Sequence, residues 1–165
     1  MALPNNNLNH SGRVGWLGID PGKMGGIAVV YRDDSIMVDA VPMPGTERDI
    51  YEAIARMNQK YQIAHAMIEL VHASPIWSRS SSFKLGDNYG FCRGVVTSLG
   101  CPWELVSPTK WQRMMNSMSG GDKNITKAAA QRLFPEAKVT HMVADAILIA
   151  EFCRRTWIHR NRDLT

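Results

Sequence analysis

The 165-residue chain has only three cysteines, Cys92, Cys101 and Cys153, an odd number without the spacing of metal ligands. We therefore expect them to be reduced thiols, as in an intracellular protein. The sequence also has no apolar run long enough to cross a membrane. Residues 1–11 are polar and rich in asparagine, and they lack the apolar core of a signal peptide. These absences predict an intracellular protein without a membrane partner.

The length and composition of the chain suit one domain. Hydrophobic residues make up 45% of the sequence, which is enough for one sizeable core. We predict a single domain over residues 13–160, with a flexible tail over residues 1–12 and a short tail over residues 161–165. The formal net charge of +4 is compatible with a nucleic-acid partner but does not by itself identify one.

The stretch over residues 15–30 organises the rest of the prediction. Its first part is apolar on both faces apart from small glycines, which is typical of a strand in the middle of a covered sheet. Asp20 follows where this strand leaves the core, Pro21-Gly22 ends the strand, and Gly25-Gly26 begins a second one. A carboxylate on a rigid central strand is well placed to bind a metal ion. The alternative is an aspartate that only caps the turn.

The remaining pattern predicts a mixed sheet flanked by helices. Alternating apolar and polar residues over 35–41 predict a third strand, antiparallel and close to an edge of the sheet. Further on, short apolar runs alternate with helical segments, which favours an α/β fold with helices on both faces of the sheet. The expected later elements are a helix after an N-cap at Thr46, strands over residues 65–70 and 102–106, and helices over residues 83–99, 109–115, 123–134 and 143–159.

Three glycines, Gly86, Gly90 and Gly94, lie one turn apart on the helix expected over residues 83–99. Glycine weakens a soluble helix, so such a stripe indicates that another backbone approaches closely. We expect this contact to be with the protein's own sheet, and the alternative is an interface between subunits.

Three acidic residues occupy the ends of predicted elements. Asp20 follows the first strand, Glu69 ends the fourth, and Asp145 opens the last helix. Each acid alone has a structural explanation, since an acid in the first turn of a helix complements the helix dipole. Acids gathered in one place, however, repel each other unless a cation lies between them. Oxygen ligands favour Mg²⁺ or Mn²⁺ over Zn²⁺, and two such ions can promote phosphodiester cleavage by water.

This arrangement resembles the RuvC-like Holliday junction resolvases of the ribonuclease H-like superfamily. Four segments in this order carry the resemblance: residues 18–26, Ile68-Glu69, residues 81–90, and His141 with Ala144-Asp145-Ala146. The resemblance spans nearly the whole chain, and its third segment looks like the helix start of phage and chloroplast-type members. It implies a ribonuclease H-like mixed five-stranded sheet with helices on both faces.

The resemblance also implies an activity and a metal site. Members of this family are metal-dependent endonucleases that act as homodimers and resolve four-way DNA junctions by paired symmetric nicks. Asp20, Glu69 and Asp145 match the metal-binding acids of the family, with Asp20 bridging two ions and each of the others holding one. The expected cofactor is Mg²⁺, with Mn²⁺ as a substitute.

Two further residues are candidates for the catalytic site by resemblance. His141 matches a fourth position of the family, where it would orient the scissile phosphate or a water, or contribute to a metal site. The three-residue spacing of bacterial members would place Met142 there instead, but methionine is a poor ligand for a hard cation. Lys123 follows a glycine-rich loop and opens a helix, in a region where a basic residue of the family comes near the cleaved phosphate.

Basic and aromatic residues flank the expected site along the sequence. Phosphate contacts supply most of the affinity for DNA, although the alternative for such residues is ordinary solvated surface. Trp77 and Phe83 border a serine-rich loop, where they would stack on bases or wedge between them, and the alternative for both is the core. The candidate phosphate contacts are Arg79, Lys84, Lys110, Arg113, Lys123 and Lys127.

Two other functions stay open on the sequence alone. One is a related nuclease that cuts flaps or RNA–DNA hybrids, and the other is a catalytically inactive junction-binding protein. An actin-like phosphotransferase would need a second phosphate loop in a second domain, for which this chain is too short.

Overall fold

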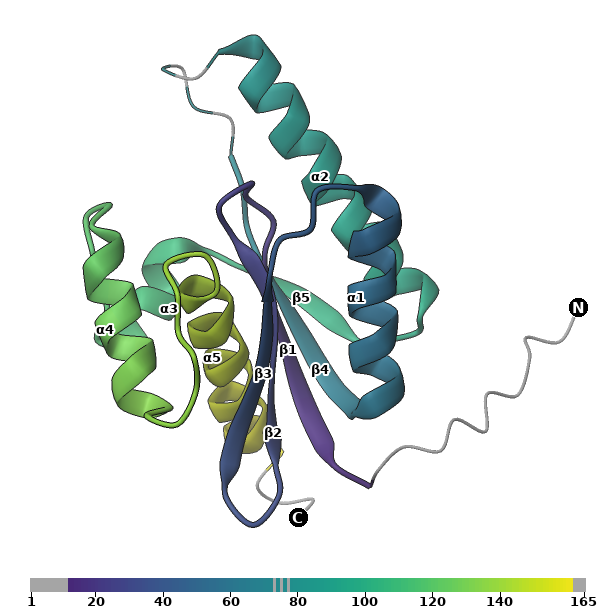
Figure 1. Cartoon of the computed structure of the whole chain (residues 1–165), viewed down its shortest axis with the longest axis vertical. Coiled ribbons are helices and arrows are strands. Elements are labelled where there is room, and N and C mark those ends of the chain that lie inside the picture. The colour runs from purple at the N-terminus through teal and green to yellow at the C-terminus, as the bar shows by residue number, and fades with distance from the viewer. Residues whose placement is uncertain (1–11, 73, 75, 77, 162–165) are drawn as a thin grey trace, which may run out of the picture.

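The computed structural model describes residues 12–72, 74, 76 and 78–161, whose arrangement is shown in Figure 1. Apart from Gly12 and Asn161, the predicted tails lie outside these residues, and so does Trp77, our candidate for base stacking. The described part forms a five-stranded sheet with helices on both of its faces. The predicted α/β class with a mixed five-stranded sheet is therefore confirmed.

The sheet combines antiparallel and parallel pairing. It consists of β1 (Val14–Asp20), β2 (Gly26–Arg32), β3 (Ile36–Pro42), β4 (Gln62–Glu69) and β5 (Trp103–Val106). These strands lie side by side in the order β3-β2-β1-β4-β5, so β1 is central and β3 is at an edge, as predicted. β2 pairs antiparallel with β1 and β3, whereas β4 pairs parallel with β1 and β5.

Helices cover both faces of the sheet and divide the core into two parts. One face carries α1 (Glu47–Lys60) and α2 (Arg79–Ser98), and the other carries α3 (Pro108–Met114), α4 (Lys123–Leu133) and α5 (Ala144–Arg160). Thr46 caps α1 as predicted, because its side chain accepts a hydrogen bond from the backbone N–H of Asp49. Among the described residues, no helix has the length and apolar character needed to cross a bilayer.

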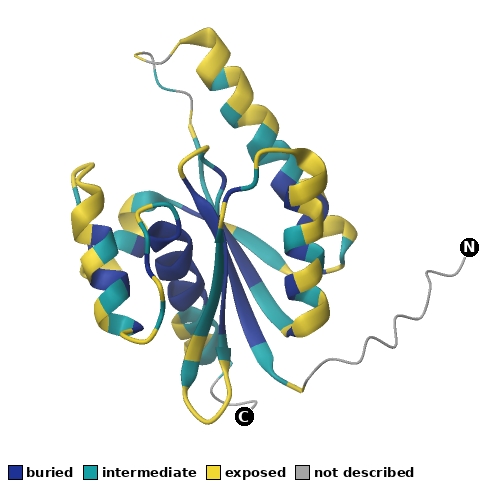
Figure 2. Ribbon diagram, viewed as in Figure 1, coloured by how far each residue is buried: buried dark blue, intermediate teal, exposed yellow. Residues whose placement is uncertain are grey.

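The last helix, α5, is the most deeply buried one (Figure 2). Every residue from Ala144 to Cys153 is buried, because α5 packs on the sheet and is covered in turn by α3 and α4. Its buried Glu151 carboxylate accepts hydrogen bonds from the guanidinium groups of Arg154 and Arg155. A helix that is apolar nearly all round suits such a position between two layers.

A close crossing of backbones fixes α5 on the central strand. A Cβ atom at Gly18 of β1 would collide with backbone atoms of Ala146 and Ala150 on α5. Glycine at this position therefore allows the helix to lie directly on the strand. Because Asp20 follows Gly18 closely and Asp145 precedes Ala146, the crossing brings the first turn of α5 to the end of β1.

The structure corrects the predicted start of α2. The helix begins at Arg79 and not at Phe83, so the second half of the serine-rich segment is helical. Serine disfavours helix interiors, so the sequence of this segment predicts a loop, but serine is also a strong N-cap. The Ser78 hydroxyl accepts a hydrogen bond from the Ser81 N–H at 3.0 Å and so caps the helix.

The glycine stripe on α2 does not face the sheet. A Cβ atom at Gly86 or Gly94 would meet no other atom within 4 Å, and one at Gly90 would only touch the end of the Arg93 side chain. Our expectation of a close contact with the protein's own sheet is therefore wrong. The buried side of α2 is made by Cys92, Val95 and Val96, and the glycines lie on its open sides.

We expect Gly18→Ala to lower the free energy of unfolding by about 3 kcal/mol, because a methyl group pressed against backbone cannot be accommodated by a rotamer change. The control is Gly45→Ala, since a Cβ atom there meets nothing within 4 Å. Urea unfolding followed by circular dichroism compares the two variants with the wild type. Equal stabilities of the two variants would contradict the close crossing of α5 over β1.

Candidate active site

The topology of the sheet brings two of the predicted acids together. β1 and β4 are parallel neighbours in which Ile19 is paired with Ile68, so Asp20 and Glu69 both follow at the same end of the sheet. Side chains at the carboxyl ends of adjacent parallel strands lie close to each other. The crossing of α5 at Gly18 adds Asp145 at this end. The three acids that the sequence separates widely thus meet at one edge.

A glycine turn holds the Asp20 carboxylate. The backbone N–H of Gly22 donates a hydrogen bond to Asp20 Oδ1 at 3.0 Å, and the turn closes with a bond from the Gly25 N–H to the Gly22 carbonyl. A Cβ atom at Gly25 would lie 2.6 Å from Asp20 Oδ2, so only glycine leaves room for the carboxylate. Asn88 of α2 fixes the turn from the other side, because its side-chain amide donates to the Pro21 carbonyl at 2.6 Å.

Asp145 is a buried carboxylate with one oxygen paired. Its Oδ2 accepts a hydrogen bond from the Lys123 ammonium group at 2.5 Å. Its Oδ1 is buried and has no hydrogen-bond partner among the described residues. A buried carboxylate oxygen without a partner is costly, so this atom is suited to a cation.

Burial and mutual repulsion raise the pKa of two of the acids. Burial raises the pKa of Asp20, and the Asp145 charge adds to this, against the lowering effects of the Gly22 N–H and the Lys123 ammonium. The pKa of Glu69 rises to about 8, chiefly through burial and then through the charge of Asp20. The opposing hydrogen bond to Glu69 comes from the indole of Trp111. Such shifts are expected where acids share a site without a cation between them.

Lys123 supplies the positive charge in this cluster. Partial burial disfavours its charged form, but the hydrogen bond to Asp145 and the three nearby carboxylates outweigh burial and raise the pKa of Lys123. Lys123 is the first residue of α4, whose N-cap is Asp122. The structure therefore brings Lys123 into direct contact with an acid of the site.

His141 lies at the rim of the site. It is exposed in the turn that precedes α5, so it does not share a helical face with Asp145. Its Nδ1 lies 3.4 Å from the backbone carbonyl oxygen of Lys123. The structure thus places His141 beside the start of α4, and its role stays a prediction.

The donor set fits a hard divalent cation. In the described part of the chain, no three His, Cys, Asp or Glu side chains are arranged as a metal site as they stand. The available ligands are nevertheless carboxylate oxygens, which Mg²⁺ and Mn²⁺ prefer. The unpartnered Asp145 Oδ1 and the raised pKa values of Asp20 and Glu69 are the features that a bound cation would relieve.

The predicted DNA contacts come from three helices. Phe83 is 75% exposed on the first turns of α2, which excludes the alternative of a core position. Arg79 and Lys84 lie on the same part of α2, which extends beyond the sheet in Figure 1. Lys110 and Arg113 are exposed on α3, and Lys127 lies half-buried on α4 one turn after Lys123. Whether these residues touch DNA stays a prediction.

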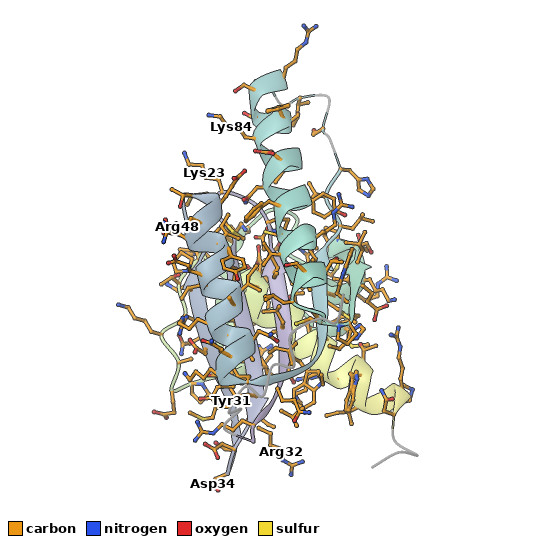
Figure 3. All side chains as sticks on the ribbon, turned by 90° about the vertical axis from the view of Figure 1, so that its right-hand side faces the viewer. Lys23, Tyr31, Arg32, Asp34, Arg48 and Lys84 are labelled. Carbon is orange, nitrogen blue, oxygen red and sulfur yellow. The ribbon has the colours of Figure 1, made fainter. Side chains whose placement is uncertain are left out.

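Three residues around the site were not predicted from the sequence. Trp111 is fully buried and donates its indole N–H to Glu69, and Asn88 supports the Asp20 turn. Lys23 is exposed in the loop between β1 and β2 and lies at the same end as Lys84 in Figure 3. The position of Lys23 between Asp20 and Gly25 was a usable signal, but the contacts of Trp111 and Asn88 join residues far apart in the sequence.

The strands of the mixed sheet lie in the order β3-β2-β1-β4-β5, helices cover both faces, and acids end β1 and β4. This arrangement is the ribonuclease H-like architecture. No protein-family model matches the sequence, and no curated protein matches it. The structure, however, is similar to that of RuvC from Thermus thermophilus.

Two RuvC structures illustrate this likeness. T. thermophilus RuvC in complex with a Holliday junction substrate matches with a TM-score of 0.61 and 15% identity, over 90% of this chain and 95% of that chain. A second Thermus thermophilus RuvC structure matches with a TM-score of 0.56 and 16% identity, over the same shares of both chains. The chain therefore has the RuvC fold, as the sequence resemblance implied.

The raised pKa of Glu69 predicts a dependence of stability on pH. Between its ordinary pKa of 4.5 and its folded value of about 8, the folded state binds more protons than the unfolded state, so stability falls as pH rises through this window. In the presence of a chelator, we expect Glu69→Gln to stabilise the protein by roughly 2–4 kcal/mol at pH 8 and by little at pH 5.

Urea unfolding at a series of pH values measures this difference. The control is Glu136→Gln, which changes an exposed acid outside the site and should leave the pH dependence as it is. If Glu69→Gln differs from the wild type by the same amount at every pH, Glu69 does not titrate as the structure indicates.

Proposed function

We propose that the protein is a divalent-metal-dependent endonuclease that resolves four-way DNA junctions by paired, symmetric nicks. The observation that carries this proposal is the meeting of Asp20, Glu69 and Asp145 at one edge of a RuvC fold. The likeness to a RuvC structure that holds a Holliday junction supports the choice of substrate. The raised pKa values of Asp20 and Glu69 support a site built around a cation.

Asp20, Glu69 and Asp145 would hold the metal. A bound Mg²⁺ or Mn²⁺ supplies Lewis-acid stabilisation of the phosphate charge and makes water more acidic. Asp20 is presented by the glycine turn with one oxygen already held by the Gly22 N–H. Asp145 offers its buried Oδ1, and Glu69 is oriented by Trp111.

Lys123 and His141 would act on the phosphate. The Lys123 ammonium is part of the acid cluster and half-exposed, so it can serve both Asp145 and an incoming phosphate oxygen. Its raised pKa keeps it charged at neutral pH. His141 is exposed next to Lys123, where it would orient the phosphate or a water.

The end of the molecule that carries the site would face the DNA. Figure 3 shows Lys23 and Lys84 at this end, whereas Asp34 lies at the opposite end. The first turns of α2 project past the sheet and present Arg79, Lys84 and the exposed Phe83. Basic side chains contact phosphates, and an exposed aromatic ring can stack on a base at an open junction.

A two-fold junction would be cut by a homodimer, because paired symmetric nicks need two sites related by symmetry. We place the contact between protomers on the face formed by α1 and α2. Gly90 and Gly94 of α2 border an open groove together with Tyr51 of α1. A Cβ atom at Gly94 would meet nothing within 4 Å and one at Gly90 only the end of the Arg93 side chain, so the backbone of a second copy could approach closely here.

We expect the protein to cut a labelled immobile four-way junction in Mg²⁺, and Asp20→Asn to lower this activity by about 100-fold or more. The reason is that Asp20 is one of the three acids that would hold the metal. The control is Asp34→Asn at the far end of the sheet, which should cut like the wild type. Duplex, flap and RNA–DNA hybrid substrates are measured in parallel.

The outcomes separate the rival functions. Paired nicks on the junction alone, lost in Asp20→Asn and on addition of a chelator, support the proposal. Tight junction binding without cleavage in Mg²⁺ or Mn²⁺ would identify an inactive binding protein. Preferential cleavage of flaps or hybrids would keep the metal site but overturn the proposed substrate.

We expect Gly94→Leu to weaken dimerisation at least about tenfold, because a large side chain in the middle of the proposed contact separates the two protomers. The monomer should fold normally, since a Cβ atom at Gly94 meets no atom within 4 Å. Glu136→Leu places the same side chain on an exposed site outside the α1–α2 face and is the control. Sedimentation equilibrium measures both, and equal dissociation constants would exclude this face as the interface.

A further inference from the structure

The indole of Trp111 makes a polar contact inside an otherwise apolar region. Trp111 lies on α3 and is fully buried in the core cluster that also contains the buried residues of α5. Its Nε1–H donates a hydrogen bond of 3.1 Å to Oε2 of Glu69. The indole N–H can only donate, so it matches a carboxylate that must stay an acceptor. A carboxylate has further lone pairs, which leaves Glu69 able to bind a cation while it is held.

The fold places Trp111 at this carboxylate by a short path. β4 and β5 are parallel neighbours in which Glu69 is paired with Val106, the last residue of β5. The chain then turns at Ser107, and α3 starts with Pro108. The backbone N–H of Trp111 bonds to the Ser107 carbonyl, so the side chain returns toward the strand end that carries Glu69.

Filling the core does not by itself explain this contact. Trp16 is also almost fully buried and belongs to the same cluster, yet its indole N–H has no hydrogen-bond partner among the described residues. This core therefore tolerates an indole whose N–H is unused. The N–H of Trp111, by contrast, points at one of the three acids of the site.

We propose that Trp111 is a positioning residue that fixes the Glu69 carboxylate for cation binding through its indole N–H. Without the bond, the glutamate side chain would sample other rotamers, and each bound cation would have to order it again. The rigid, buried ring holds the carboxylate in one orientation before the cation arrives. This inference rests on the proposed function, because it assumes that Glu69 contributes to a metal site.

The test compares two substitutions that each remove one indole N–H. Trp111→Phe removes the donor to Glu69, and Trp16→Phe removes the N–H that has no partner in the described part of the chain. Both variants lose a similar amount of packing, so the difference between their Mn²⁺ affinities reports the effect of the hydrogen bond to Glu69. Titration of the DNA-free protein with Mn²⁺ by calorimetry measures binding, and urea unfolding measures stability.

We expect Trp111→Phe to weaken Mn²⁺ binding about tenfold and Trp16→Phe to leave it unchanged, since outer-shell partners of metal ligands typically contribute about 10–100-fold. In a Glu69→Gln background, Trp111→Phe should have no further effect on Mn²⁺ affinity. At saturating Mg²⁺, the cleavage rate of Trp111→Phe should approach that of the wild type, because the loss lies in cation binding.

Three results would overturn the inference. If the wild type binds Mn²⁺ and the two Phe variants bind it equally well, Trp111 does not position Glu69 and the proposed function stands. If Trp111→Phe weakens binding equally with and without Glu69, it acts through general packing. If the wild type binds no Mn²⁺, both the metal site and the inference fail.

A second replacement tests the same inference if Trp111→Phe does not fold. Site-specific incorporation of benzothienylalanine at position 111 keeps the two-ring shape and exchanges the N–H for sulfur. Weaker Mn²⁺ binding by this protein at unchanged stability supports the inference, and wild-type binding overturns it.

Discussion

The close crossing of α5 over β1 at Gly18 is the contact that completes the site. The helix backbone lies against the strand backbone with no side chain between them. This contact buries α5 between the sheet and the outer helices, and it brings the first turn of the helix to the strand end that carries Asp20. One packing contact thus both buries α5 and adds Asp145 to the acids that β1 and β4 already bring together.

The same packing gathers acidic side chains whose charges repel each other. Three carboxylates meet at a partly buried edge, where burial and repulsion raise the pKa of two of them, Asp20 and Glu69. The Lys123 ammonium offsets part of the negative charge by pairing with Asp145. The raised pKa values of Asp20 and Glu69 make the cation-free protein less stable at high pH, and a bound divalent cation, as proposed, would relieve the repulsion between the acids.

Much of the fold was predictable because its signals are local. The apolar strand before Asp20, the glycine turn after it, the edge strand β3 and the Thr46 cap of α1 each follow from a few adjacent residues. The start of α2 was predicted wrongly because serine both breaks helices and caps them, and Ser78 acts as a cap here. The glycine stripe was assigned to the wrong surface because periodicity shows that residues share a face but not what the face meets.

The sequence by itself determined which acids end which elements, and parallel pairing of two such strands is enough to expect Asp20 and Glu69 side by side. It also determined the glycines that a tight turn and a close helix crossing require. Only the tertiary structure decided that Lys123 pairs with Asp145, that His141 stays at the rim, and that Trp111 reaches Glu69. The physical reason is that these contacts join side chains distant in the chain, and their geometry depends on how the helices pack on the sheet.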